Sequence, residues 1–173
     1  MESVFPVAKF RPGGLNGKKR TSEEIKENYE KGDEFAGSNF CQIVGTERPG
    51  PLVKLSFGFY EPLDIEDAGI SFNENVYGMP ARSVAASDSA YLYFECASPR
   101  LDGSDEQAAL IVGRLRYERK TAEGTLAQRD ANMTILHAAT LAVAKKLECE
   151  NDGGLPAKAD LRVLEASNSD KEQ

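Results

Sequence analysis

The sequence DANMTILHAATLAVAKKLECE occupies residues 130–150 and contains the clearest helical pattern in the chain. One face of this predicted helix is defined by residues that recur at helical spacing, Met133, Leu136, Thr140, Val143 and Leu147. A flank of mostly small residues predicts a close approach to a sheet: Ile135, Ala138, Ala142 and Cys149. The following NDGGLP, residues 151–156, predicts a helix stop with glycine in a left-handed cap and proline beyond it.

Short segments that precede this helix have the alternating polarity of strands. The clearest spans residues 52–60, where one face carries Val53, Leu55, Phe57 and Phe59. Other strands are predicted over residues 40–44, 81–85, 90–97 and 109–118, and residues 161–164 fit either a closing strand or a docked extension. Capping-box spacing between Thr21 and Glu24 predicts a short amino-terminal helix that ends at Gly32. Because one long helix follows a run of strands, we expect an α+β fold in which that helix covers a largely antiparallel sheet.

Length and charge limit the domain organisation and the partners. A chain of 173 residues suits one domain that buries about 70% of its unfolded surface. We expect a flexible arm over residues 1–20, a single domain over 21–165 and a disordered tail over 166–173. The net charge of -7 disfavours nucleic acid and direct lipid binding, since both need clustered Lys and Arg. No apolar run approaches the roughly 20 residues that cross a bilayer, and the first residues lack the pattern of a signal peptide.

Two of the three cysteines are predicted to point into the same layer. Cys96 shares a strand face with Leu92 and Phe94, and Cys149 lies at the end of the predicted helix. A bond between them would close a loop of 53 residues (149 − 96) and contribute about 4 kcal/mol in the chain-entropy model. Two buried free thiols that act as small hydrophobic groups fit the same pattern, and the residues alone leave both possibilities open.

Four motifs carry a resemblance to a known group of proteins. They are YLYFECASPRL at 91–101, GRLRYE at 113–118, ANMTILH at 131–137 and LECENDGGLP at 147–156. Together they resemble an uncharacterised family of Streptomyces and related actinobacterial proteins, which are typically exported and preceded by a membrane anchor. The resemblance covers residues 13–156 and implies an extracytoplasmic, cell-surface or membrane-anchored location without a known activity. Such a compartment favours the Cys96–Cys149 bond and leaves Cys41 as an unpaired thiol.

The sequence contains no convergent catalytic set, so we predict no cofactor and no metal. His137 is the only histidine, which argues against a zinc site, and a structural role is favoured over a nucleophilic pair with Cys41. The phosphate-binding, dinucleotide-binding and serine-nucleophile motifs are missing. Residues 102–106, DGSDE, could supply two or three calcium ligands, but acidic turn residues usually only solvate a loop.

The candidate interaction surface comprises a predicted loop over residues 61–80 and two outward-facing tyrosines. The aromatic residues that we assign to it are Phe72, Tyr77, Tyr91 and Tyr93, since exposed aromatic side chains often anchor interfaces. Ordinary strand propensity is the alternative explanation for the two strand tyrosines. A row of arginines could receive an acidic partner, but surface ion pairs with neighbouring acids are favoured: Arg114, Arg116 and Arg119.

These patterns lead us to expect a non-enzymatic domain that binds a protein or cell-envelope ligand outside the cytoplasm. The first alternative is a hydrolase with a carboxylate or cysteine centre, which a pocket with Cys41 or with two close carboxylates would favour. The second alternative is a structural subunit of an assembly, which a broad exposed apolar patch would favour.

Overall fold

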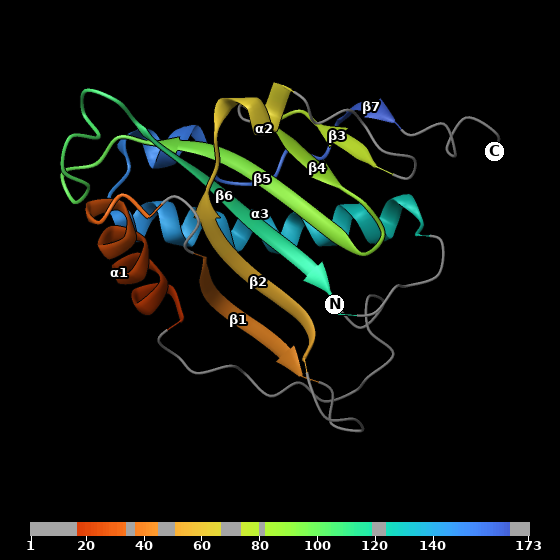
Figure 1. The fold of residues 1–173 in the computed structure, drawn as a ribbon. Coiled ribbons are helices and arrows are strands. Elements are labelled where there is room, and N and C mark those ends of the chain that lie inside the picture. Colours follow the sequence, from red (N-terminus) through yellow and green to blue (C-terminus); the bar gives the residue numbers. More distant parts are fainter. Residues whose placement is uncertain are drawn as a thin grey trace.

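The computed structural model describes residues 17–33, 37–44, 51–66, 74–79, 82–118 and 124–166. Within them, seven strands form one antiparallel sheet in the order β1-β2-β6-β5-β4-β3-β7 (Figure 1). The strands are β1 Ser38–Val44, β2 Pro51–Phe59, β3 Asn75–Tyr77, β4 Ser83–Ala85, β5 Ser89–Cys96, β6 Ala109–Tyr117 and β7 Val163–Ala166. The helices are α1 Gly17–Glu30, α2 Pro62–Glu66 and α3 Leu126–Leu147. The predicted α+β fold with a largely antiparallel sheet is confirmed.

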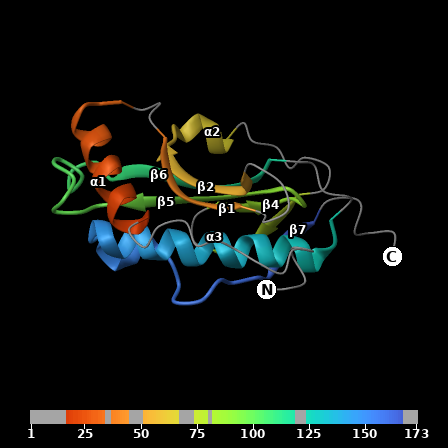
Figure 2. The same cartoon turned by 90° about the horizontal axis from the view of Figure 1, so that it is seen from below.

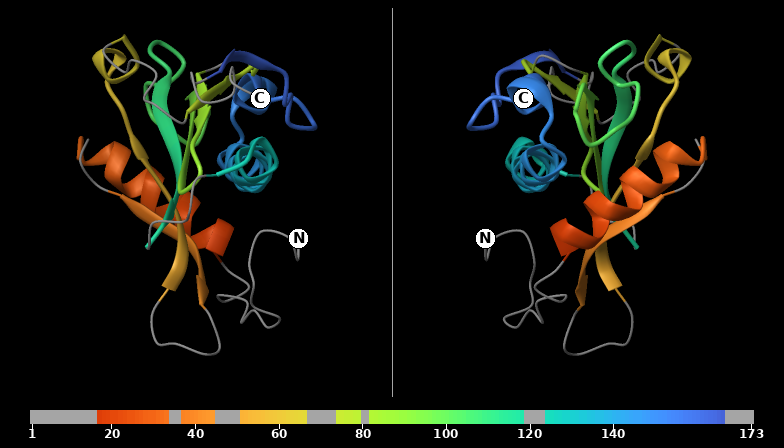
Figure 3. Two further views of the ribbon diagram at one scale, coloured as in Figure 1. Left: turned by 90° about the vertical axis from the view of Figure 1, so that its right-hand side faces the viewer. Right: turned by 90° about the vertical axis from the view of Figure 1, so that its left-hand side faces the viewer.

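The sheet has an inner face, covered by α3, and an outer face on the side of α2. Figure 2 shows α3 and α2 on opposite sides of the sheet, and Figure 3 shows the sheet edge-on beside α3. On the inner face the alternating residues are at most 3% exposed: Val53, Leu55, Phe57, Leu92, Phe94, Cys96, Ala109, Ile111 and Leu115. The predicted helix face is confirmed, because all five of its residues are buried. The predicted flank is only partly in contact: Ala138 is exposed, whereas Ile135 packs against the core and Cys149 is buried and bonded to β5.

A glycine of the sheet allows α3 to pack closely. Gly113 of β6 lies beneath the helix, and a Cβ atom at this position would be 2.8 Å from Thr140 Oγ1 and 3.2 Å from Leu136 Cδ1. Any larger side chain would therefore push the helix away from the strand. The close approach depends on a small residue in the strand as well as on the composition of the helix.

Both ends of α3 differ from the prediction. The helix begins at Leu126, four residues before the predicted stretch, because the Thr125 side chain caps it by accepting a hydrogen bond from Gln128 N. It ends at Leu147, and the left-handed cap is Glu148 (φ 61°) and not a glycine. The predicted glycine stop is wrong in this respect. The glycines belong instead to the next turn, Glu150–Gly154, where four successive residues have positive φ: Asn151, Asp152, Gly153 and Gly154.

The amino-terminal helix is longer than predicted. Because α1 starts at Gly17, the last four residues of the predicted arm are helical. The predicted capping box is wrong: Thr21 lies inside the helix, is fully buried and donates a hydrogen bond to the carbonyl oxygen of Asn39 in β1 (3.3 Å). Glu24 accepts a hydrogen bond from the Ser38 hydroxyl. These contacts with β1, rather than a local cap, position the helix.

The chain between β2 and β4 and the carboxyl end also differ in detail. The predicted loop over residues 61–80 contains α2 and the short strand β3. The predicted closing strand is present as β7, which pairs with β3. It ends at Ala166, so the first residue of the predicted tail is part of the sheet, and residues 167–173 lie outside the described residues.

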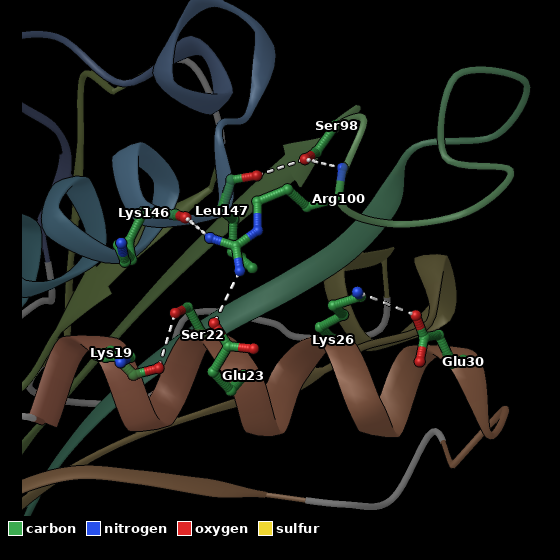
Figure 4. A network of polar contacts seen from close by, with 9 residues as sticks. All are labelled: Lys19, Ser22, Glu23, Lys26, Glu30, Ser98, Arg100, Lys146 and Leu147. Atoms are coloured by element: carbon green, nitrogen blue, oxygen red, sulfur yellow. Dashed lines mark hydrogen bonds and ion pairs between the residues drawn. The ribbon is translucent and has the colours of Figure 1, made fainter.

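Covalent and polar contacts hold the carboxyl end of α3 to the rest of the domain. Cys96 of β5 and Cys149 form a disulfide with their Cα atoms 4.9 Å apart. The Ser98 hydroxyl donates to the carbonyl oxygen of Leu147, and Arg100 Nη1 donates to that of Lys146 (2.8 Å). Arg100 Nη2 also donates to Glu23 Oε1 of α1 at 2.8 Å, so one guanidinium connects both helices (Figure 4). Arg100 thus occupies the helix terminus that favours a cation.

Candidate binding cleft

A cleft of about 770 Å³ opens at one end of the sheet. Its walls are the end of α1 (residues 28–33), the segment that joins β2 to α2 (residues 58–64) and residues 103–110 before and within β6, and Arg114 also lines it. A volume of this size lies within the range of about 300–1,000 Å³ that is typical of small-ligand sites. The cleft is therefore large enough to hold a ligand of a few residues.

The sequence positions the cleft walls through simple local chemistry. Tyr60 N donates to Leu110 O (3.1 Å), which extends the pairing of β2 with β6 by one residue. Pro62 then starts α2, where a proline costs no hydrogen bond. Asp64 caps the same turn, because its Oδ2 atom accepts from Glu61 N at 2.9 Å. On the opposite wall, the ring of Tyr29 in α1 lies 6.0 Å from that of Phe59.

Among the described residues that line the cleft, Arg114 is the only arginine or lysine. It projects from β6 on the outer face, between Ser56 of β2 and Tyr91 of β5. Its side chain is half-buried, and its contact is a 3.5 Å hydrogen bond from Nη2 to the carbonyl oxygen of Phe59. Among the described residues it forms no ion pair.

The predicted ion pairs of the arginine row are therefore wrong for the described part of the chain. Neither Arg114 nor Arg116 forms an ion pair with a described acid, and the nearby Glu118 pairs with Lys54 Nζ at 2.6 Å. Arg119 lies outside the described residues. Arg114 has Ser56 and Tyr91 as its neighbours on the two adjacent strands, so no acid lies directly opposite it.

Two tyrosines form an aromatic wall beside Arg114. The rings of Tyr60 and Tyr93 meet edge-to-face, with centroids 5.0 Å apart and an interplanar angle of 85°. Burial, together with the nearby Glu95 and Tyr93, raises the pKa of Tyr60 to about 12, so its hydroxyl stays a hydrogen-bond donor at neutral pH. Tyr91 and Tyr93 are both half-buried on the outer face, and neither lines the cleft directly.

Carboxylates surround the cleft. Its lining includes four exposed acidic side chains, Asp33, Glu61, Asp64 and Glu106. The segment that was considered for calcium contributes Gly103 and Glu106 to this lining. Across the described ranges, no three acidic, histidine or cysteine side chains are grouped so that they could hold a metal ion. The described lining of the cleft thus combines exposed carboxylates with one half-buried guanidinium, that of Arg114.

One residue of the predicted interaction surface is buried. Tyr77 was expected to be exposed, but it is only 1% exposed, because β3 turns it toward α3, where its hydroxyl donates to Asp130 Oδ1 at 2.8 Å. Burial raises the pKa of Tyr77, and the hydrogen bond to Asp130 raises it further. Its assignment to the interaction surface is wrong. Phe72 lies outside the described residues.

The residues considered for nucleophilic catalysis lie elsewhere. Cys41 is a free, half-buried thiol of β1 that does not line the cleft, and burial raises its pKa. His137 of α3 is 3% exposed, and burial lowers its pKa, an effect that the Pro156 backbone opposes. A raised thiol pKa disfavours the thiolate that a nucleophile requires.

Comparison of the chain with protein-family models, with curated proteins and with solved structures finds no match in any of the three. None of the helices in the described ranges combines the length and hydrophobicity of a membrane span. The candidate function therefore depends on the chemistry of the cleft.

Proposed function

We propose that this chain is a non-enzymatic binding domain that recognises a protein or cell-envelope ligand through the cleft at the end of the sheet. The observation that carries the proposal is the half-buried Arg114, which lines a cleft of about 770 Å³ without an ion pair to any described acid. An arginine in such a position retains hydrogen-bond donors for a ligand. Tyr60, which lines the cleft and packs edge-to-face on Tyr93, offers a rigid apolar surface.

We further propose that the domain acts outside the cytoplasm, at the cell surface or on a membrane anchor. The Cys96–Cys149 disulfide is compatible with this location, because disulfides persist mainly in oxidising compartments. The resemblance of the four sequence motifs to exported actinobacterial proteins supports the same compartment. Secretion of the native protein, followed by detection of the oxidised form on the cell surface, would test it.

The alternative of a hydrolase receives less support from the described residues. A cysteine centre would need Cys41 in the cleft, and Cys41 does not line it. The four acids of the cleft are exposed, whereas a catalytic acid usually gains its raised pKa from a desolvated position. The alternative of a structural subunit has one favourable observation, the exposed Val163 and Leu164 (36% and 62%) on the edge strand β7.

The proposed function can be tested by nuclear magnetic resonance titration of the ¹⁵N-labelled domain. The additions are soluble fragments of a digested actinobacterial cell wall and, separately, peptides from a proteolysed envelope fraction. We expect amide shifts concentrated in residues 58–61 and 103–110 for at least one preparation. Binding that leaves these amides unchanged, or cleavage of the added material, would contradict the proposal.

A further inference from the structure

The hydrogen-bonding capacity of Arg114 is largely unused. A guanidinium has five N–H donors in a planar fork, and the structure provides one acceptor at 3.5 Å, the carbonyl oxygen of Phe59. The chain has 28 acidic residues, yet none in the described part pairs with this side chain. Partial burial raises the cost of leaving such donors unpaired. The position therefore favours an acceptor that comes from a ligand.

The planar fork of an arginine matches a carboxylate, which can accept two parallel hydrogen bonds from it. Tyr60 lines the same cleft, and with a pKa of about 12 it keeps a hydroxyl proton that can be donated to the same anion. Phosphate also fits a guanidinium. The four acids of the lining discriminate between these anions, because they repel a doubly charged group more strongly than a singly charged one.

The same acids favour a ligand that also carries positive charge. Asp33 and Glu106 lie on the walls formed by α1 and by residues 103–110, while Glu61 and Asp64 lie at the start of α2. A cationic group beside the bound carboxylate would meet carboxylates on either wall. The ligand that best complements this distribution has one carboxylate and at least one ammonium or guanidinium group.

Building on the proposed function, we propose that the cleft binds the carboxyl terminus of a short peptide that carries a basic side chain. Arg114 holds the terminal carboxylate, Tyr60 supplies a further donor and the acids of the lining attract the basic side chain. The cleft volume of about 770 Å³ accommodates a terminus of a few residues. Recognition of a free chain end would make the domain selective for cleaved or unlinked peptide segments.

The test uses three probes with the wild-type domain: the tripeptide lysyl-alanyl-alanine, its carboxyl-terminal amide, and inorganic phosphate. Dissociation constants come from the amide shifts of residues 58–61 and 103–110. We expect the free peptide to bind about tenfold more tightly than its amide, which corresponds to about 1.4 kcal/mol, because amidation removes the charge-assisted hydrogen bonds. We expect phosphate to bind more weakly than the free peptide.

Three variants test whether the preference for the free carboxylate over the amide depends on the side chain of Arg114. In Arg114→Gln the free peptide and its amide should bind equally weakly, while Arg114→Lys should restore part of the difference, because lysine keeps the charge without the fork. Arg116→Gln is the matched control: it removes the same charge from the same strand face at an exposed position outside the cleft. It should retain the tenfold preference.

The outcomes separate this inference from the proposed function. Equal binding of peptide and amide by the wild-type domain, tighter binding of phosphate, or an equal loss in Arg116→Gln overturns the role of Arg114. If the peptides leave the cleft amides unchanged while cell-wall fragments shift them, the ligand class is wrong and the binding function stands. If no preparation shifts these amides, both proposals fail.

Discussion

The inner and outer faces of the sheet are built from the same strands and differ in what they leave unsatisfied. On the inner face, Leu92 and Phe94 are fully buried beneath α3, and a disulfide closes one end of the layer. On the outer face, Tyr93 and Arg114 are half-buried, and the arginine forms no ion pair among the described residues. The inner face therefore carries the stability of the domain, and the outer face retains side chains that are able to bind.

Within a single strand, the residues that stabilise the core and the residues available for binding therefore lie on opposite faces. Successive residues of β6, such as Gly113 and Arg114, point to opposite faces and serve different purposes. Substitutions toward α3 should reduce the free energy of unfolding, and substitutions toward the cleft should change binding with little effect on folding. The following experiments test that separation.

Removal of the disulfide should have the largest effect. In Cys96→Ala/Cys149→Ala we expect the free energy of unfolding to fall by about 4 kcal/mol, because the unfolded chain is no longer closed over the loop of 53 residues. Urea unfolding with and without reductant measures this loss. Cys41→Ala, which removes the free thiol, should stay close to the wild type; a loss as large as that of the double variant would contradict the assignment.

A methyl group beneath α3 should be nearly as damaging. We expect Gly113→Ala to cost about 1–3 kcal/mol through overpacking, since the new Cβ would approach Thr140 Oγ1 to 2.8 Å. The control is Gly37→Ala, where the nearest atom, Phe57 O, would be 3.8 Å away. Similar unfolding midpoints for the two variants would show that the helix can shift without cost.

The buried histidine should make stability depend on pH. Burial lowers the pKa of His137 in the folded state below its ordinary value of 6.5. The neutral side chain therefore makes its full contribution to the free energy of unfolding above that pH. As the pH falls through 6.5, the unfolded chain takes up a proton that the folded chain resists, and stability decreases toward the folded pKa. His137→Gln should lack this part of the decrease. Parallel stability curves between pH 7.5 and 5 for the two proteins would refute the effect.

The polar link between the helices should have a smaller effect. Arg100→Ala removes the contacts with Glu23 and with the carbonyl oxygen of Lys146, and we expect a loss of about 1 kcal/mol. Hydrogen exchange should accelerate mainly in α1. The control Lys26→Ala breaks the exposed Lys26–Glu30 pair in the same view (Figure 4), which should contribute almost nothing. Equal effects would mean that the link is only a surface ion pair.

The outer face should show the smallest change in stability. We expect Arg114→Gln to alter the free energy of unfolding by no more than about 0.5 kcal/mol, because no ion pair is lost. The same variant should lose the cleft shifts that cell-wall fragments or peptides induce. A large loss of stability would show that the arginine belongs to the structure of the domain and would end the separation of the two faces.

Local pattern determined most of the elements of this chain. The period of two in β2 and the helical spacing of Met133 and Leu136 each have one solution that buries the apolar residues, so the sheet and its covering helix were predictable. The start of α1 and the turn after α3 were not, because they depend on contacts with distant residues, whereas the Thr125 cap at the start of α3 is a local signal that the prediction missed. Thr21 bonds to β1, and Glu148, in the left-handed conformation, directly precedes the Cys149 that is bonded to β5.

The cleft was decided by the tertiary structure. Tyr60 had a weak local signal, an aromatic residue at a strand end before a proline turn, and Arg114 looked like an ordinary surface cation. The prediction that Tyr77 is exposed was wrong, because nothing in the neighbouring sequence reveals that β3 turns this side chain toward Asp130. Whether a polar side chain finds a partner depends on which strands become neighbours. Pairing of β2 with β6 brings Lys54 to Glu118, whereas Arg114, between Ser56 and Tyr91, forms no ion pair with a described acid.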